Sequence, residues 1–142
     1  MIEADVGAEP EWGAGIDMES VDRFAGDIGE FMSGVYSRLF SESEHLYCVG
    51  AADPAIAYAA IWCLKEAALK ALWQWIRLDP RRIIVNREDG AELGFLVDGQ
   101  PLAALNVEAD ISLTESSGLV VAVVLTRRIP RQREDSTPVT SA

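Results

Sequence analysis

The stretch 53–76, DPAIAYAAIWCLKEAALKALWQWI, carries the strongest helical signal in the sequence, and it decides the fold. Asp53 is a good N-cap residue and Pro54 suits the first helical position, so the helix has a defined start. The Ala-rich composition predicts a helix that continues to the end of this stretch, before Asp79-Pro80 stops it. The spacing of its apolar residues predicts a buried stripe made of Ala57, Ile61, Leu64, Ala68, Leu72 and Trp75.

Four apolar segments after this helix predict β-strands. Segments 82–85 and 93–97 flank the turn-forming residues 87–90, and segments 107–114 and 119–126 flank a Glu-Ser-Ser-Gly turn. The run 119–125 is apolar at every position, which predicts a strand covered on both faces. We therefore expect an α+β fold in which the long central helix packs on an antiparallel sheet.

Three shorter elements are expected before the helix. Residues 12–16 predict a short strand, and the apolar spacing in 19–31 predicts an amphipathic helix. Ser41 and Glu44 form a capping box, which predicts a second short helix that ends near Val49. We expect residues 1–11 to be a flexible acidic leader, 12–126 a single domain, and 127–142 a disordered tail, because the tail is rich in charge, Ser, Thr and Pro.

The length and the net charge of the chain limit the classes of function and partner that it can have. A chain of 142 residues is one domain's worth, and 49% hydrophobic residues suffice for a core. The net charge of −11 disfavours nucleic acid and anionic membranes as partners. No secretory signal is visible and the longest apolar run is too short to span a membrane, so we expect a cytoplasmic protein. Cys48 and Cys63 lack the spacing of a disulfide framework or zinc site, so buried thiols are expected.

Three charged residues stand among apolar or small neighbours: Asp17, Glu66 and Lys70. Glu66 and Lys70 are four residues apart, so they share one helical face, and an ordinary intrahelical ion pair is one interpretation. Asp17 follows a Gly-rich strand, where an Asp commonly caps the next helix. Alternatively, the two carboxylates meet across a cleft and share a hard divalent cation such as Mg²⁺, with Lys70 facing substrate phosphates.

These residues lie in motifs that resemble the holo-acyl-carrier-protein synthase type of 4′-phosphopantetheinyl transferase. The motifs are Gly13-x-Gly15-Ile16-Asp17-Met18, then the segment 62–72 with Lys65-Glu66-Ala67-Ala68-Leu69-Lys70-Ala71, then Ile111-Ser112-Leu113-Thr114 before a final apolar strand. The resemblance covers most of residues 13–125 and implies a small phosphopantetheinyl-transferase-like fold.

The resemblance also implies an activity, which is Mg²⁺-dependent transfer of the phosphopantetheine arm of coenzyme A to a serine of an acyl or peptidyl carrier protein. Asp17 and Glu66 would hold the metal, and Glu66 and Lys70 would be catalytic. Lys65, Lys70 and Ser112 would bind the coenzyme A co-substrate, and Arg23 would contact the carrier. Such enzymes act in fatty acid or polyketide biosynthesis and are similar in forming trimers with sites at subunit boundaries, so we expect a homotrimer.

Four positions depart from the family pattern. Ile61 stands where the family usually has a phosphate-binding Arg, and Trp73-Gln74-Trp75 replaces a Gly-Thr-Gly. Asp110 replaces a His, and the region after Asp17 keeps only Arg23 as a base among acids. The departures leave an alternative open, namely a catalytically degenerate relative that acts as a binding or assembly partner in a carrier-based pathway.

Overall fold

The structure, a computed structural model, describes residues 10–26, 34–87 and 92–130. Their elements are β1 (Trp12–Ser20), η1 (Val21–Arg23), η2 (Val35–Leu39), α2 (Glu42–Gly50), α3 (Pro54–Leu72), η3 (Pro80–Arg82), β2 (Ile83–Asn86), β3 (Gly94–Val97), β4 (Gln100–Pro101), η4 (Leu102–Leu105), β5 (Val107–Ser116) and β6 (Leu119–Arg128). Within these ranges, no helix combines the length and apolarity needed to cross a membrane.

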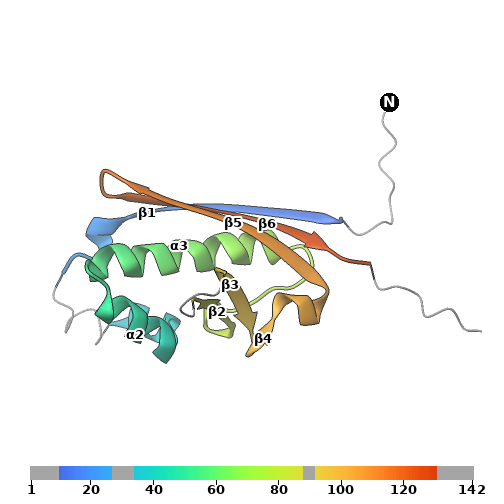
Figure 1. Ribbon diagram of the computed structural model, residues 1–142, viewed down its shortest axis with the longest axis horizontal. Helices are drawn as coiled ribbons and strands as arrows, with labels where there is room; N and C mark the ends of the chain where they lie inside the picture. Colours follow the sequence, from blue (N-terminus) through green and yellow to red (C-terminus); the bar gives the residue numbers. More distant parts are fainter. Residues whose placement is uncertain (1–9, 27–33, 88–91, 131–142) are drawn as a thin grey trace, which may run out of the picture.

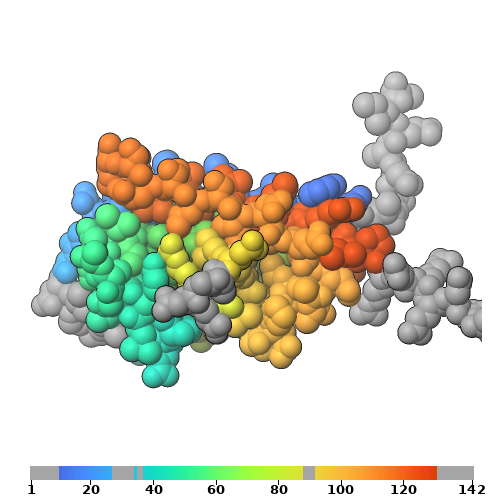
Figure 2. Space-filling model, in the orientation of Figure 1, coloured from blue at the N-terminus to red at the C-terminus, as the bar shows by residue number. Residues whose placement is uncertain are grey.

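Helix α3 lies between two layers (Figure 1). One layer is an antiparallel sheet of order β1-β6-β5, and the other contains the small sheet β2-β3-β4 and helix α2. In Figure 2, the hairpins coloured yellow to red cover most of α3 from this side. The expected α+β architecture, with a long central helix on an antiparallel sheet, is confirmed.

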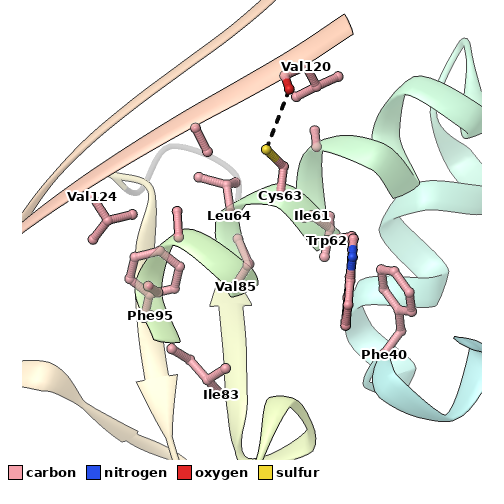
Figure 3. Close-up of a cluster of buried hydrophobic side chains, with 14 of the residues drawn as sticks. Phe40, Ile61, Trp62, Cys63, Leu64, Ile83, Val85, Phe95, Val120 and Val124 are labelled. Atoms are coloured by element: carbon pink, nitrogen blue, oxygen red, sulfur yellow. Dashed lines mark hydrogen bonds between the residues drawn. The ribbon is translucent and has the colours of Figure 1, made fainter. Parts of the chain in front are cut away.

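Because α3 has layers on both sides, it is buried around most of its circumference rather than along one stripe. Figure 3 shows how its side chains reach both layers: the Cys63 thiol donates to the Val120 carbonyl of β6 at 3.6 Å, and Trp62 packs beside Phe40. Phe95 and Val85 of the small sheet complete the core on the side of α3 that faces away from β6. An Ala-rich helix suits this position because small side chains allow the layers to approach closely.

Two glycines let strand β1 lie directly against α3. A Cβ atom at Gly15 would overlap the Ala67 carbonyl, and one at Gly13 would overlap the Ala71 carbonyl. The buried Thr126 hydroxyl of β6 also donates to the Ala71 carbonyl, at 2.9 Å. The backbone of β1 is therefore held against the helix without intervening side chains, and this contact fixes the position of the residues that follow in the strand.

A buried ion pair joins α2 to the opposite side of α3. Lys65 Nζ lies 2.8 Å from Glu44 Oε2, and both side chains are fully buried. Lys65 also donates to the Leu39 carbonyl at 2.7 Å, and Glu44 accepts from the backbone N–H groups of Val85 and Ser41, each at 2.8 Å. The pair thus has hydrogen-bonding partners on both sides, as a buried charge pair requires.

Several predicted element boundaries are wrong. Strand β1 runs on to Ser20, so residues 19 and 20 are strand and not helix, and in the described residues 21–26 the 3-10 turn η1 follows it. Positions 27–31 of the expected helix lie outside the described residues. Helix α3 ends at Leu72, earlier than predicted, because two side chains of the next turn bind the N-terminal segment: Gln74 Nε2 donates to the Trp12 carbonyl and Trp75 Nε1 to the Pro10 carbonyl.

The other expected elements are present with small shifts. The capping box at Ser41 and Glu44 begins α2, and both predicted hairpins form. Strand β6 continues to Arg128, two residues past the expected end of the domain, because Arg128 N–H donates to the Glu11 carbonyl and the next residue bonds to Asn106. The leader at positions 1–9 and the tail at 131–142 lie outside the described residues.

The face of the β1-β6-β5 sheet that points away from α3 is exposed, and it is apolar along strands β1 and β6 but polar along β5. We call it the outer face. It carries Trp12, Ile16, Met18, Leu119, Val123 and Leu125, which are between 39% and 62% exposed. Strand β6 was expected to be covered on both faces, and within one chain this is wrong: Val120, Ala122 and Val124 are buried against α3, but the alternate residues are not.

Candidate active site

Asp17 lies where β1 crosses the middle of α3. Alternate residues of β1 point toward the helix, and Asp17 belongs to that inward set. Its backbone carbonyl accepts a hydrogen bond from the Cys63 thiol at 3.1 Å. Its carboxylate is 14% exposed; Oδ1 is bonded to Lys70, whereas the buried Oδ2 has no hydrogen-bond partner among the described residues. A buried carboxylate oxygen without a partner is unfavourable unless a ligand satisfies it.

Glu66 of α3 faces the same place. Burial raises the pKa of its carboxyl group, the nearby carboxylate of Asp17 raises it further, and the Lys70 ammonium lowers it. A carboxyl group whose pKa is raised by burial and by a neighbouring carboxylate is common at catalytic and cation-binding sites. Asp17 and Glu66 therefore lie near one another at the strand–helix contact, and their joint binding of a metal stays a prediction.

Lys70 lies one turn further along α3 and completes the group. Its ammonium donates to Asp17 Oδ1 at 3.1 Å and to the Ile16 carbonyl at 2.9 Å, and its side chain is half exposed. The ammonium therefore pairs with the strand carboxylate rather than forming the plain intrahelical pair with Glu66. It can bind an anion at this edge because half of it remains accessible.

The carboxylates suit a divalent cation. Hard oxygen ligands are those that Mg²⁺ prefers, and protein Mg²⁺ sites often use one or two carboxylates with substrate and water filling the rest. The unpartnered Asp17 Oδ2 is a carboxylate oxygen that a bound cation would satisfy. The described ranges contain no cluster of three or more His, Cys, Asp or Glu groups able to hold a metal by themselves.

Lys65 does not join this group. Its side chain points to the other side of α3, where it is fully buried and paired with Glu44. Burial lowers the pKa of Lys65, and the Glu44 carboxylate opposes that shift. The expectation that Lys65 attracts phosphate does not fit this position, because residues adjacent in a helix point about 100° apart. Its neighbour Glu66 takes the face toward β1.

Ser112 lies on the other side of the sheet. In the register of the strands, Ser112 of β5 pairs with Val123, which pairs with Ile16 of β1. Ile16 precedes Asp17, and successive strand residues point to opposite faces. Ser112 and Asp110 are therefore on the exposed outer face, and one chain does not bring Ser112 together with Asp17, Glu66 and Lys70.

Arg23 lies beside the group, in the turn η1. Its guanidinium lies 3.1 Å from both carboxylate oxygens of Glu19, and its side chain is 42% exposed. Glu19 is a site residue that the sequence reasoning missed. It lies two residues after Asp17 on the same inward side of β1, and its charge also raises the pKa of Glu66. Strand alternation from Asp17 could have revealed it, but the strand was predicted to end at residue 16.

Comparison with known proteins identifies the family of this chain. The family model described as the 4′-phosphopantetheinyl transferase superfamily matches residues 13–124. A holo-[acyl-carrier-protein] synthase of Myxococcus xanthus is 30% identical over 117 residues, which are 80% of this chain and 92% of the relative. The synthase of Chlamydia trachomatis serovar L2 is 28% identical over 116 residues, 80% of this chain and 98% of that protein.

Solved structures show the same fold. The structure described as a Chronobacterium ammoniagenes ACPS–CoA complex matches with a TM-score of 0.67 at 19% identity, covering 85% of this chain and all of that one. The Helicobacter pylori synthase in complex with coenzyme A matches with a TM-score of 0.61 at 24% identity, covering 78% and 96% of the two chains. The match over residues 13–124 spans the glycine contact, the two carboxylates and Lys70, and this chain belongs to the 4′-phosphopantetheinyl transferase superfamily.

Proposed function

We propose that this protein transfers the 4′-phosphopantetheine arm of coenzyme A to a serine of an acyl or peptidyl carrier protein, with Mg²⁺. The observation that carries the proposal is the meeting of Asp17, Glu66 and Lys70 at the β1–α3 contact of a chain from this superfamily. The synthases it resembles are named for this activity, and two of the solved relatives are described with coenzyme A bound.

In the proposed reaction, the serine oxygen forms a bond to the phosphorus that carries pantetheine. The bond from that phosphorus to the bridging oxygen breaks, and adenosine 3′,5′-bisphosphate leaves with the electron pair. Glu66 accepts the serine proton directly or through a water. Lys70 balances the charge of the leaving phosphate from its exposed position one turn away.

Asp17 and Glu66 would hold the Mg²⁺. When bound, the ion supplies positive charge that screens the diphosphate and stabilises the phosphoryl oxygens in the transition state. The chain's own contribution is to fix the two carboxylates, because the backbone of β1 rests on α3 at Gly13 and Gly15.

We further propose that the working form is a homotrimer with sites at subunit boundaries. The exposed apolar outer face supports this, since a large continuous apolar patch usually marks an interface. Ser112 lies on that face, so it can reach a phosphopantetheinyl site only in a neighbouring subunit. The proposal keeps the cytoplasmic location expected from the sequence.

The carrier is expected to be unusual. Arg23, the residue we assign to carrier contact, is already paired with Glu19, and the chain carries a net charge of −11. Like charges slow and weaken association, so strongly acidic carriers are poor partners. We expect a carrier whose contact surface is neutral or basic.

The test is mass spectrometry of apo-carriers incubated with the purified protein, coenzyme A and Mg²⁺. We expect at least one carrier to gain the mass of the phosphopantetheine arm, and Asp17→Ala and Glu66→Ala to abolish the gain. Glu42→Ala, which removes an exposed acid of α2, is the matched control and should retain activity. Coenzyme A should also raise the melting temperature more with Mg²⁺ than without it. No modification of any carrier, together with no coenzyme A binding, would favour the degenerate relative instead.

A further inference from the structure

We propose that Trp73 and Arg77 form the binding site for the nucleotide end of coenzyme A, with the indole stacking on adenine and the guanidinium holding the 3′-phosphate. This inference rests on the proposed function, because it deepens the account of the same site. It assigns ligand contacts to two residues just past the end of α3, at positions where this sequence departs from its family.

Glu66, Lys70 and Trp73 follow one another at spacings of four and three residues, which places them on one side of α3 and its C-cap. Arg77 lies beyond the helix and joins this row through its contact with the Trp73 ring. The α3 helix is assigned to Leu72, but helix-like hydrogen bonding continues, since Ile76 N–H donates to the Leu72 carbonyl at 2.8 Å. The row therefore leads from the proposed catalytic groups toward the C-terminal end of α3.

The two residues after Trp73 hydrogen-bond to the N-terminal segment, whereas the Trp73 side chain is exposed. Gln74 donates to the Trp12 carbonyl at 2.6 Å, and Trp75 is half-buried and donates to the Pro10 carbonyl at 2.9 Å. Both side chains thus hold the start of β1. Trp73 is 56% exposed, and the Arg77 guanidinium carbon lies 4.6 Å from its ring centroid. More than half of the indole surface is accessible even with the guanidinium seated on it.

The nucleotide and this row are chemically complementary. Adenosine 3′,5′-bisphosphate presents one aromatic base and two anionic groups. The row presents one accessible indole, with the Lys70 ammonium before it on α3 and the Arg77 guanidinium on the ring itself. A guanidinium stacked on an aromatic ring keeps its N–H donors available for a phosphate, and indoles stack on bases without regard to sequence.

The two ends of α3 differ in the side chains that they offer to a nucleotide. On the other side of Glu66, the same helix face offers Trp62 and Ala59, which are 7% and 0% exposed and carry no charge. Ile61, where the family pattern places a phosphate-binding Arg, is 1% exposed and lies in the core. Cations that could hold a nucleotide therefore occur at and just beyond the C-terminal end of α3, and the pantetheine arm would extend the opposite way, toward Arg23.

The test is calorimetric titration of coenzyme A, 3′-dephospho-coenzyme A and 4′-phosphopantetheine into the Mg²⁺-loaded full-length protein. Trp73→Ala should weaken coenzyme A binding by roughly tenfold, as the loss of one stacked base implies, and Trp73→Phe should restore most of it. Arg77→Ala should weaken coenzyme A but leave 3′-dephospho-coenzyme A unchanged. Binding of 4′-phosphopantetheine should be unchanged in all variants.

Arg87→Ala is the matched control, because Arg87 is also exposed and stacks on an aromatic ring, that of Tyr47, at 5.1 Å. It removes the same charge and the same type of contact, and it should leave all three affinities unchanged. In turnover assays, Trp73→Ala and Arg77→Ala should raise KM for coenzyme A with kcat unchanged, which is the signature of lost ground-state binding.

The outcomes separate the two proposals. If the wild-type protein binds coenzyme A and the Trp73 and Arg77 variants bind it equally well, the nucleotide site is elsewhere and only the present inference is wrong. If Arg77→Ala weakens coenzyme A and its dephospho form alike, the contact to the 3′-phosphate is wrong. If the wild-type protein binds no coenzyme A at all, the proposed function fails and this inference fails with it.

Discussion

Two lysines five residues apart in α3 should respond oppositely to the same substitution. Lys65 is fully buried against Glu44, whereas Lys70 is half exposed beside Asp17. Lys→Met keeps most of the volume of the side chain and removes its charge and its N–H donors. We expect Lys65→Met to destabilise the fold strongly with its site groups intact, and Lys70→Met to remove activity with little change in stability.

The magnitudes follow from the environments. Lys65→Met leaves a buried carboxylate without its counter-charge and leaves the Leu39 carbonyl without its donor, and breaking a buried pair in this way costs about 3–5 kcal/mol. With domains of this size, that corresponds to a fall in melting temperature of roughly 10–20 °C. An exposed pair such as Lys70–Asp17 contributes about 0.2–1 kcal/mol.

Urea denaturation followed by circular dichroism measures both variants, and mass gain of a carrier measures activity. Glu44→Gln and the double variant Lys65→Met/Glu44→Gln complete a cycle, in which the double variant should be more stable than the sum of the single losses by more than about 1 kcal/mol. The reasoning would be refuted if Lys65→Met kept wild-type stability, the cycle were additive and the variant had a raised KM for coenzyme A. Those results would restore the phosphate-binding role that the sequence suggested for Lys65.

Three further predictions follow from packing and exposure. Gly15→Ala should lower the free energy of unfolding by at least about 2 kcal/mol, because the added methyl overlaps the Ala67 carbonyl, while Gly50→Ala, with open space around it, should change it by less than about 1 kcal/mol in the same denaturation assay. Cys48 and Cys63 are fully buried, and burial raises the pKa of each thiol to about 12, so neither should react with a thiol reagent at pH 8 until urea unfolds the chain. The thiols of the unfolded chain ionise near pH 9 whereas the folded ones do not, so the free energy of unfolding should also fall between pH 9 and 12. Ile16→Glu on the outer face should turn the proposed trimer into a monomer in light scattering, and Leu46→Glu, which changes an even more exposed apolar residue of α2, should not; a wild-type monomer would contradict the proposed assembly.

The sequence predicted the parts of the fold that rest on local signals. The start of α3 at Asp53 and Pro54 and the capping box of α2 depend on side chains next to the backbone groups they satisfy, so local pattern was sufficient. The length of β1 is not determined by local sequence. Residues 17–20 extend the strand because β6 pairs with them as far as Leu119, and that pairing brings together residues about a hundred positions apart.

The candidate site was predictable in part for the same reason. Asp17, Glu66 and Lys70 were singled out from motifs, and the structure places the Lys70 ammonium on Asp17 with Glu66 nearby, while their joint role stays a prediction. Lys65 was misjudged because its partner Glu44 lies on another helix, and no sequence pattern links the two. Glu19 was missed because the strand that presents it was cut short, and the outer-face position of Ser112 follows only from the register of three strands.

The contact of β1 with α3 through Gly13 and Gly15 has a consequence for how this protein can diverge. The backbone positions of the two acids are set by main chain resting on main chain, so core substitutions elsewhere do little to move them. Changes at Ile61, at 73–75 and at Asp110 can therefore accumulate around an unaltered inner geometry. Related sequences can change their preference for the donor or for the acceptor protein by single substitutions around the site, while the chemistry at Asp17 and Glu66 stays constant.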